Sequence, residues 1–171
     1  MDDAGTGTGY MKATFAAGCF WGVEAAFRKM KGVISTRVGY TGGQLNDPTY
    51  LDVCTGTTGH AEAVEITYDP AILTYRQLLA EFFHIHDPTT PDRQGPDVGC
   101  QYRSVIFYHD DTQRAAAESC MMHLDSGGRY RQPVVTHVVP VSEFFEAEEY
   151  HQQYFEKNKG TMCHILEKHG H

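Results

Sequence analysis

Short apolar runs and longer segments of mixed polarity follow one another along this chain. Five segments show the alternation or the short apolar run that is typical of β-strands, and glycine or proline lies close to several of their ends. The predicted strands are residues 11–17, 32–40, 61–69, 102–110 and 134–141.

Four segments between and after these strands are predicted to be helices: residues 20–32, 74–86, 111–124 and 142–158. In the first, apolar residues recur at helical spacing from Val23 to Met30, and Gly32 is expected to end the helix. Thr74 is a candidate N-cap for the second, and Ser142 opens the fourth before an acidic first turn.

The interleaved order of strands and helices predicts a single α+β domain over residues 1–171. We expect a two-layer sandwich with a ferredoxin-like core, in which helices pack on a small mixed or antiparallel sheet. Glycine, asparagine and proline predict loops at 41–49 and 87–101, and a long loop in a compact domain is often functional. Residues 1–10 are expected to be a flexible tail, and residues 159–171 a mobile one.

Composition narrows the classes of function. The chain has 171 residues, 41% of them hydrophobic, which is enough for a core that needs no disulfide staples. Its formal net charge is −8, from 14 basic and 22 acidic residues, and it contains no basic block. Such a surface repels a polyanion at neutral pH, so neither nucleic acid nor an anionic membrane is an expected partner.

Membrane attachment is not predicted either. No stretch approaches the roughly 20 apolar residues that span a bilayer. Residues 15–19, FAAGC, look like a lipoprotein cleavage box, but Asp2 and Asp3 stand where a signal peptide needs positive charge. The odd number of irregularly spaced cysteines indicates a reducing compartment, and hence the cytoplasm. These cysteines are Cys19, Cys54, Cys100, Cys120 and Cys163.

Cys19 is the first candidate for chemistry, in the stretch AAGCFWGVE of residues 16–24. If the strand ends near Ala17 and the helix begins near Phe20, Cys19 lies at a helix N-terminus, which favours the nucleophilic thiolate. Gly18 would allow a tight turn, and Trp21 would line an apolar wall. A buried packing cysteine explains the same stretch equally well, so this motif alone leaves both interpretations open.

A second cluster combines a carboxylate with phenols. Tyr50, His60 and Glu62 lie near glycine-rich turns, and Asp97 and Tyr102 lead from the long loop onto a strand. A buried carboxylic acid with two phenols could protonate and hold an oxygen bonded to the atom under attack. Taken singly, each of these residues is more often an ordinary surface residue.

Two other kinds of chemistry could use some of these residues. A cysteine hydrolase or acyltransferase would pair Cys19 with a histidine base, for which His60 is the candidate, but no third orienting residue is evident. Histidines and cysteines could also bind a metal ion, yet the chain lacks C-x-x-C, H-E-x-x-H or any regular ligand spacing, so no metal site is predicted.

Six motifs in order resemble the peptide methionine sulfoxide reductase A family, over residues 11 to 163. They are GCFWGVE (18–24), GYTGG (39–43), PTYLDVCTGTTGHAEAVEITYDP (48–70), FFHIHDPTT (82–90), DVGCQYRS (97–104) and FEAEEYHQQYF (145–155). The resemblance implies an enzyme that reduces the S epimer of methionine sulfoxide, free or in proteins, and so repairs oxidative damage.

The resemblance also implies roles for individual residues. Cys19 would attack the sulfoxide sulfur and become a sulfenic acid, while Glu62, Tyr50 and Tyr102 protonate and orient the oxygen. Asp97 would hydrogen-bond the substrate through a water molecule. Two aromatic residues would receive the ε-methyl group, and His60 is a further substrate-binding candidate; the aromatic pair is Phe20 and Trp21.

Turnover would then require a second cysteine, whose disulfide with Cys19 thioredoxin reduces. Cys163 matches the resolving position of many family members, and Cys54 and Cys100 remain alternatives. Cys120, in the middle of a predicted helix, is expected to be a packed core thiol. No bound cofactor is expected beyond an external reductant, thioredoxin or a dithiol, and we expect a monomer because a repair enzyme needs an open site.

Overall fold

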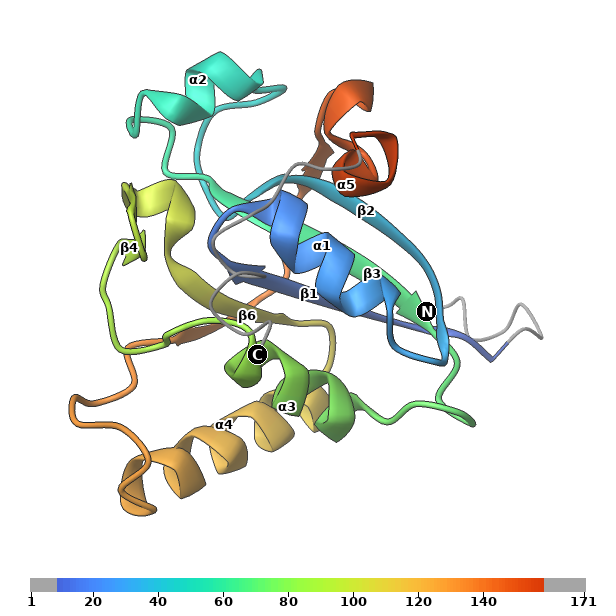
Figure 1. Cartoon of the computed structure of the whole chain (residues 1–171), viewed down its shortest axis with the longest axis vertical. Coiled ribbons are helices and arrows are strands. Elements are labelled where there is room, and N and C mark those ends of the chain that lie inside the picture. The colour runs from blue at the N-terminus through green and yellow to red at the C-terminus, as the bar shows by residue number, and fades with distance from the viewer. Residues whose placement is uncertain (1–8, 159–171) are drawn as a thin grey trace.

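The computed structural model describes residues 9–158 (Figure 1). Its strands are β1 (Met11–Ala17), β2 (Val33–Thr41), β3 (Ala61–Tyr68), β4 (Arg93–Gln94), β5 (Asp97–Val98), β6 (Ser104–Tyr108), β7 (His137–Pro140) and β8 (Phe144–Glu146). Its helices are α1 (Phe20–Arg28), α2 (Tyr50–Cys54), α3 (Tyr75–His84), α4 (Asp111–Ser126) and α5 (Tyr154–Lys157), with short 3-10 helices η2 (Cys100–Tyr102) and η3 (Glu149–His151).

Six strands form one mixed sheet in the order β7-β6-β1-β3-β2-β8. The pairings β6-β1, β1-β3, β3-β2 and β2-β8 are antiparallel, whereas β7 lies parallel to β6 at one edge. β4 and β5 form a separate small hairpin. The prediction of an α+β domain built on a mixed sheet is therefore confirmed.

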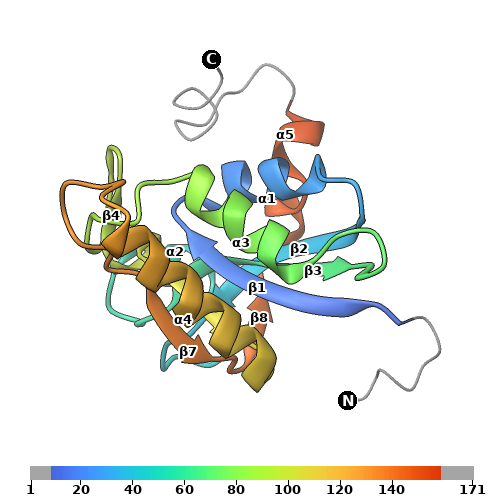
Figure 2. The same ribbon diagram turned by 90° about the horizontal axis from the view of Figure 1, so that it is seen from below.

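Three helices cover one face of this sheet, as Figure 2 shows. α1 packs against β1, β2 and β3, α3 against β1, and α4 against β6 and β7. Alternate residues of β1 point into this layer, and the ring of Phe15 stacks at 5.4 Å on Phe27 of α1 and at 5.1 Å on Phe82 of α3. The main apolar core thus fixes α1 directly over the centre of the sheet.

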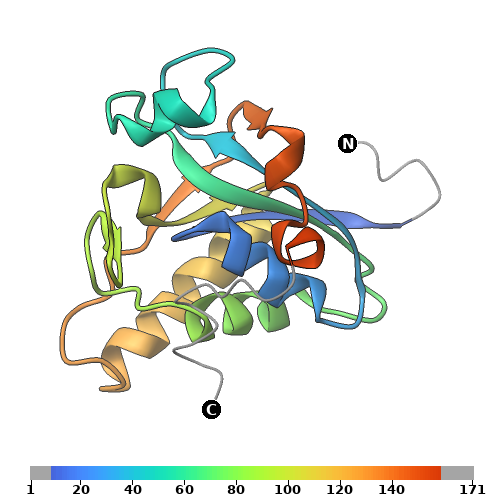
Figure 3. The same cartoon turned by 45° about the horizontal axis from the view of Figure 1, so that its top comes forward.

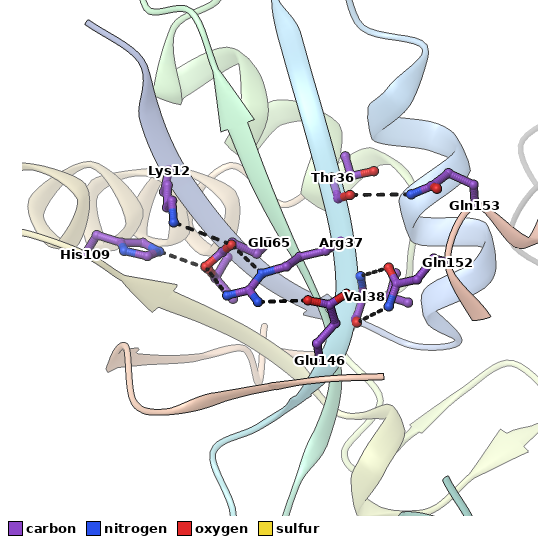
Figure 4. Close-up of polar contacts among 10 residues, drawn as sticks. Lys12, Thr36, Arg37, Val38, Glu65, His109, Glu146, Gln152 and Gln153 are labelled. Atoms are coloured by element: carbon purple, nitrogen blue, oxygen red, sulfur yellow. Dashed lines mark hydrogen bonds and ion pairs between the residues drawn. The ribbon is translucent and has the colours of Figure 1, made fainter. Parts of the chain in front are cut away.

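The opposite face combines a small apolar cluster with charged residues. Ala16, Ala63 and Phe107 belong to that cluster. Beside it, the Arg37 guanidinium donates to Glu65 at 2.7 Å and to Glu146 at 3.2 Å, which ties β2 to β3 and to β8 (Figure 4). Both faces of the central strands are therefore covered near one end, which explains why β1 is so apolar.

The predicted helix over residues 142–158 is wrong. The segment instead forms β8, η3 and α5, and it crosses the sheet edge beside α1. Gln152 explains part of this path: its side-chain amide accepts from the Val38 N–H and donates to the Val38 carbonyl, both at 2.9 Å (Figure 4). Gln153 adopts a left-handed backbone conformation with φ of 49°, which a continuous helix forbids. These long-range bonds override the local helical pattern.

Other boundaries shift by less. The first helix ends at Arg28 rather than Gly32, because the chain turns through Gly32, with φ of 105°, into β2. Residues 50–54 form the helix α2, which the sequence pattern did not predict, and the loop at 87–101 contains β4 and β5. The predicted tails fall almost wholly on residues 1–8 and 159–171, outside the described part of the chain. Within residues 9–158, no helix is both long and apolar enough to cross a bilayer.

Candidate active site

Cys19 lies at the junction of β1 and α1, one residue before the helix begins. Its carbonyl accepts the first helical hydrogen bond, from the Val23 N–H at 3.4 Å, and its side chain makes no capping bond to the helix backbone. The side chain is half-buried. A sulfur at this point meets the positive end of the α1 dipole, which favours the thiolate, as the sequence motif predicts.

Glu62 reaches this junction from β3. Its side chain is 2% exposed, and its Oε1 accepts a hydrogen bond at 3.1 Å from the N–H of Phe20, the residue after Cys19. The strand register also pairs Glu62 with Tyr40 of β2. β1 and β3 run antiparallel side by side, so the end of β1 and the start of β3 meet at one end of the sheet. The sheet thereby fixes a buried carboxyl beside the thiol.

Two tyrosines approach the same point from outside the sheet. Burial raises the pKa of the Tyr50 phenol on α2, and a hydrogen bond with Cys54 and the charge of Glu62 raise it further. Burial likewise raises the pKa of Tyr102, at the end of η2, and four nearby acidic groups add to that effect. These groups are Glu62, Asp97, Cys19 and Cys54. Both phenols are therefore held protonated as hydrogen-bond donors.

Figures 1 and 3 show why the two tyrosines lie near Glu62 and Cys19. α2 and the segment from β4 to η2 lie at the same end of the sheet, near the start of α1. The structure thus brings together five sequence-predicted residues from five separate segments. They are Cys19, Tyr50, Glu62, Asp97 and Tyr102.

Aromatic side chains form one wall of the site. The Phe20 ring lies 5.7 Å from the Tyr40 ring and 5.2 Å from the His151 ring. The Trp21 indole stacks on Tyr154 at 3.7 Å, nearly parallel, and its Nε1–H donates to His151 Nδ1 at 2.9 Å. These contacts hold Phe20 and Trp21 in place and give the site an apolar side.

His151 and Glu148 complete this wall, and sequence reasoning assigned neither of them a role. His151 is fully buried, and its ring lies 4.5 Å from that of Tyr50. Burial lowers the pKa of His151, although Glu148 opposes the effect. Glu148 accepts from the Tyr40 hydroxyl and from the Tyr50 N–H, both at 2.9 Å. The motif FEAEEYHQQYF pointed to this segment as part of the family pattern. Because the sequence predicted a continuous helix there, it did not indicate that these two side chains face the site.

His60 has a different environment. Its Nδ1 accepts from the Gly43 N–H at 3.0 Å, so the neutral ring carries its proton on Nε2, which donates to the Leu45 carbonyl at 2.7 Å. The ring is 1% exposed. Both nitrogens are therefore used to hold the loop after β2, which leaves no nitrogen to activate Cys19 in the hydrolase alternative.

The remaining cysteines occupy distinct positions. Cys54 is exposed at the end of α2, and Cys100 lies at the start of η2, where its Sγ donates to the Gly56 carbonyl at 3.5 Å. Cys120 on α4 packs against the main core, and burial raises the pKa of its thiol. Cys163 lies outside the described residues.

Two hollows of the described chain lie away from this site, and the one of about 600 Å³ is lined by His84, His86 and Asp87 but by no cysteine. A cavity of about 840 Å³ lies between α3 and α4 at the far end of β1, and no cysteine or histidine lines it. Over residues 9–158, no three His, Cys, Asp or Glu side chains are grouped closely enough to hold a metal ion.

The sequence and the fold are both similar to characterised proteins. The family model described as "Peptide methionine sulfoxide reductase" matches residues 11–171. A "Peptide methionine sulfoxide reductase MsrA" from Methanothermobacter thermautotrophicus is 62% identical over 157 residues, which cover 92% of this chain and 93% of that protein. One from Geobacter sulfurreducens is 54% identical over 159 residues, covering 93% of this chain and 98% of that protein.

Two solved structures show the same architecture. Reduced Mxr1 from Saccharomyces cerevisiae superposes with a TM-score of 0.85 at 36% identity, covering 91% of this chain and 90% of Mxr1. Mxr1 in complex with Trx2 gives a TM-score of 0.61 at 28% identity, covering 85% of this chain and 84% of that chain.

Proposed function

The chain belongs to the peptide methionine sulfoxide reductase family, and we propose that it reduces the S epimer of methionine sulfoxide, free or within oxidised proteins, at Cys19. The observation that carries this proposal is the hydrogen bond from the Phe20 N–H to Glu62, which fixes a buried carboxyl next to the thiol. Two protonated phenols at the same point supply donors for an oxygen atom.

The reaction transfers one oxygen atom from sulfur to sulfur. The Cys19 thiolate attacks the sulfoxide sulfur, Glu62 donates a proton to the oxygen, and methionine leaves as the oxygen becomes bonded to Cys19 as a sulfenic acid. A sulfoxide oxygen is a poor leaving group until it is protonated, so the reaction needs an acid near the thiol, and Glu62 bonds to the residue after Cys19. Tyr50 and Tyr102 orient the oxygen and stabilise its developing charge.

Substrate orientation comes from the two unlike sides of the pocket. Phe20 and Trp21 form the apolar side and receive the ε-methyl group, while Glu62 and the two phenols form the polar side. A sulfoxide sulfur is a stereocentre, so this arrangement selects one epimer. Asp97 hydrogen-bonds the substrate through a water molecule. His60 contributes by holding the loop between β2 and α2 at Leu45.

Recycling requires a resolving cysteine and an external reductant. Cys163 is proposed as the resolving residue because its position matches that of the family, with Cys54 and Cys100 as alternatives. Thioredoxin is the proposed reductant, supported by the solved complex of the similar yeast Mxr1 with Trx2. Reduction by a dithiol needs no bound cofactor.

The wider assignments follow from sequence and topology. We propose a cytoplasmic monomer with one domain over residues 1–171, which binds neither nucleic acid nor membranes, consistent with its formal charge of −8. A ferredoxin-like core is supported by the antiparallel strand order β6-β1-β3-β2 and by helices α1 and α3, which connect β1 to β2 and β3 to β6. Helices on one face of the sheet support the two-layer description.

A single-turnover assay without reductant tests the reaction. The enzyme is mixed with the S or the R epimer of a blocked methionine sulfoxide, and the methionine released is counted for the parent and for Cys19→Ser. We expect about one or more equivalents from the S epimer only, and none from Cys19→Ser. Methionine from neither epimer would overturn the proposal, and an enzyme that leaves Cys19 reduced would favour the hydrolase.

A further inference from the structure

Two thiols besides Cys19 lie on the short helices that carry the site tyrosines, Cys54 on α2 with Tyr50 and Cys100 on η2 with Tyr102. Cys54 ends α2 and is exposed, and Cys100 begins η2 and is partly exposed. The Cys100 Sγ donates a hydrogen bond to the carbonyl of Gly56 at 3.5 Å. Cys100 therefore already contacts the backbone only two residues beyond Cys54, although the two cysteines are 46 positions apart in the sequence.

Cys54 also faces the catalytic phenols. It lies one helical turn after Tyr50 on α2, so the two side chains project from the same face of that helix. The Tyr50 ring lies 4.5 Å from the His151 ring, which itself lies 5.2 Å from the ring of Phe20, the residue after Cys19. α2 therefore holds Cys54 near the segment that carries Cys19. Burial, followed by nearby acidic groups that include both thiols, raises the pKa of Tyr102.

The backbone between these thiols has room to adjust. α2 contains only five residues, and residues 54–57 are all exposed. Gly56 has φ of 76°, and nothing lies within 4 Å of the position that a side chain would occupy there. A disulfide requires the two Cβ atoms to be about 4 Å apart. A Cys54–Cys100 disulfide therefore requires this exposed turn to approach η2, which it already contacts through Cys100 Sγ.

We propose that Cys54 and Cys100 form a dithiol that accepts the oxidising equivalent from Cys19 independently of Cys163, an inference that rests on the proposed sulfoxide reduction. The Cys54 thiol attacks the Cys19 sulfenic acid, which forms a Cys19–Cys54 disulfide and releases water. The Cys100 thiol then attacks the Cys54 sulfur, which forms a Cys54–Cys100 disulfide and returns Cys19 to the thiol. The two electrons come from the dithiol, and an external dithiol such as thioredoxin restores it.

This transfer places the final disulfide where a reductant can reach it. Cys19 is half-buried, whereas Cys54 is exposed at the end of α2. In an enzyme that lacks Cys163, the transfer also doubles the number of methionine molecules released without reductant. The dithiol reduces the first sulfenic acid, and Cys19 then reacts with a second sulfoxide.

The test counts methionine released from excess S-epimer sulfoxide, without reductant, in a Cys163→Ser background. We expect about two equivalents per enzyme from Cys163→Ser, and about one when Cys100→Ser or Cys54→Ser is added. Cys120→Ala is the matched control, since Cys120 packs on α4 away from the site, and it should retain two equivalents. Non-reducing peptide mapping of the reacted Cys163→Ser enzyme should recover a Cys54–Cys100 disulfide.

The outcomes separate this inference from the reaction on which it rests. If Cys163→Ser yields one equivalent, or if adding Cys100→Ser leaves two, the dithiol transfer is wrong while sulfoxide reduction stands. If no variant that retains Cys19 yields methionine, the proposed reaction itself fails. Release of the first equivalent of methionine also shows that a variant is folded and active. A variant that fails to release only the second equivalent is therefore defective in the transfer of electrons from the dithiol.

Discussion

The Oε1 atom of Glu62 accepts a hydrogen bond from the backbone N–H of Phe20 at 3.1 Å. This bond joins β3 to the first turn of α1, and it links the two residues across 42 positions of sequence. A side chain fixed to the residue after Cys19 cannot swing away from the thiol. The proposed proton donor is therefore placed by the same contact that completes the start of the helix.

Glu62→Gln should separate the chemical role of this carboxyl from its structural one. The glutamine carbonyl can still accept from Phe20, but the amide cannot donate a proton as an acid does. We expect the rate of the first methionine equivalent to fall by about 10²–10⁴, the usual contribution of a general acid. Rapid-quench single turnovers measure this rate, and thermal melts report whether the fold is retained.

Glu65→Gln is the matched control for that experiment. Glu65 lies on the same strand but bonds to Arg37 on the opposite face of the sheet. It should keep the rate of the parent, because its partners Arg37 and Lys12 lie on the face of the sheet that does not carry the site. Equal rates for Glu62→Gln and the parent would exclude Glu62 as the acid.

The buried ring of His151 should make stability depend on pH. Burial lowers the pKa of His151 below its ordinary value of 6.5. As the pH falls below about 6.5, the unfolded chain binds the proton before the folded protein does, so the free energy of unfolding decreases. Above that pH both states are neutral, and this contribution to stability is fully retained.

His151→Gln removes this titration. Urea unfolding at pH 7.5 and at pH 5.5 should show a smaller loss of stability in the variant than in the parent. His109, whose pKa burial also lowers, is present in both proteins and cancels in the comparison. Identical losses in the two proteins would mean that His151 titrates alike in the folded and unfolded states.

Gln152 should be essential for the path of the C-terminal segment. Its amide makes two hydrogen bonds to Val38 and donates a third to the Ala147 carbonyl, all at 2.9 Å and all buried. Gln152→Glu keeps the shape but lacks the two donated bonds, and each buried carbonyl left unpaired costs about 1–3 kcal/mol. We expect a loss of about 2–5 kcal/mol in urea unfolding. A loss below 1 kcal/mol would show that another path of the segment is equally stable.

His60 should affect stability and leave the chemistry unchanged. His60→Gln loses at least one of the bonds to Gly43 and Leu45, so the free energy of unfolding should fall by about 1–3 kcal/mol. The pH profile of the first methionine equivalent should keep its shape, because the ring has no nitrogen available for proton transfer. A profile that loses one ionisation in the variant would restore His60 as a catalytic base.

Much of this protein is determined by short-range sequence patterns. The apolar run of residues 11–17 sets β1, and the capping threonine at residue 74 starts α3, because both depend on neighbouring residues alone. The motif around Cys19 likewise determines a thiol at a helix start, since strand, glycine and helix follow one another within a few residues.

The tertiary structure decided what depends on distant contacts. Residues 142–158 have the composition of a helix, yet bonds from Gln152 to Val38 and from Gln153 to the buried Glu24 hold them in another conformation. The wall that contains Glu148 and His151 exists only because of that path. Local propensity amounts to a few tenths of a kcal/mol per residue, whereas one buried polar group left unpaired costs about 1–3 kcal/mol, so the distant partners determine the outcome.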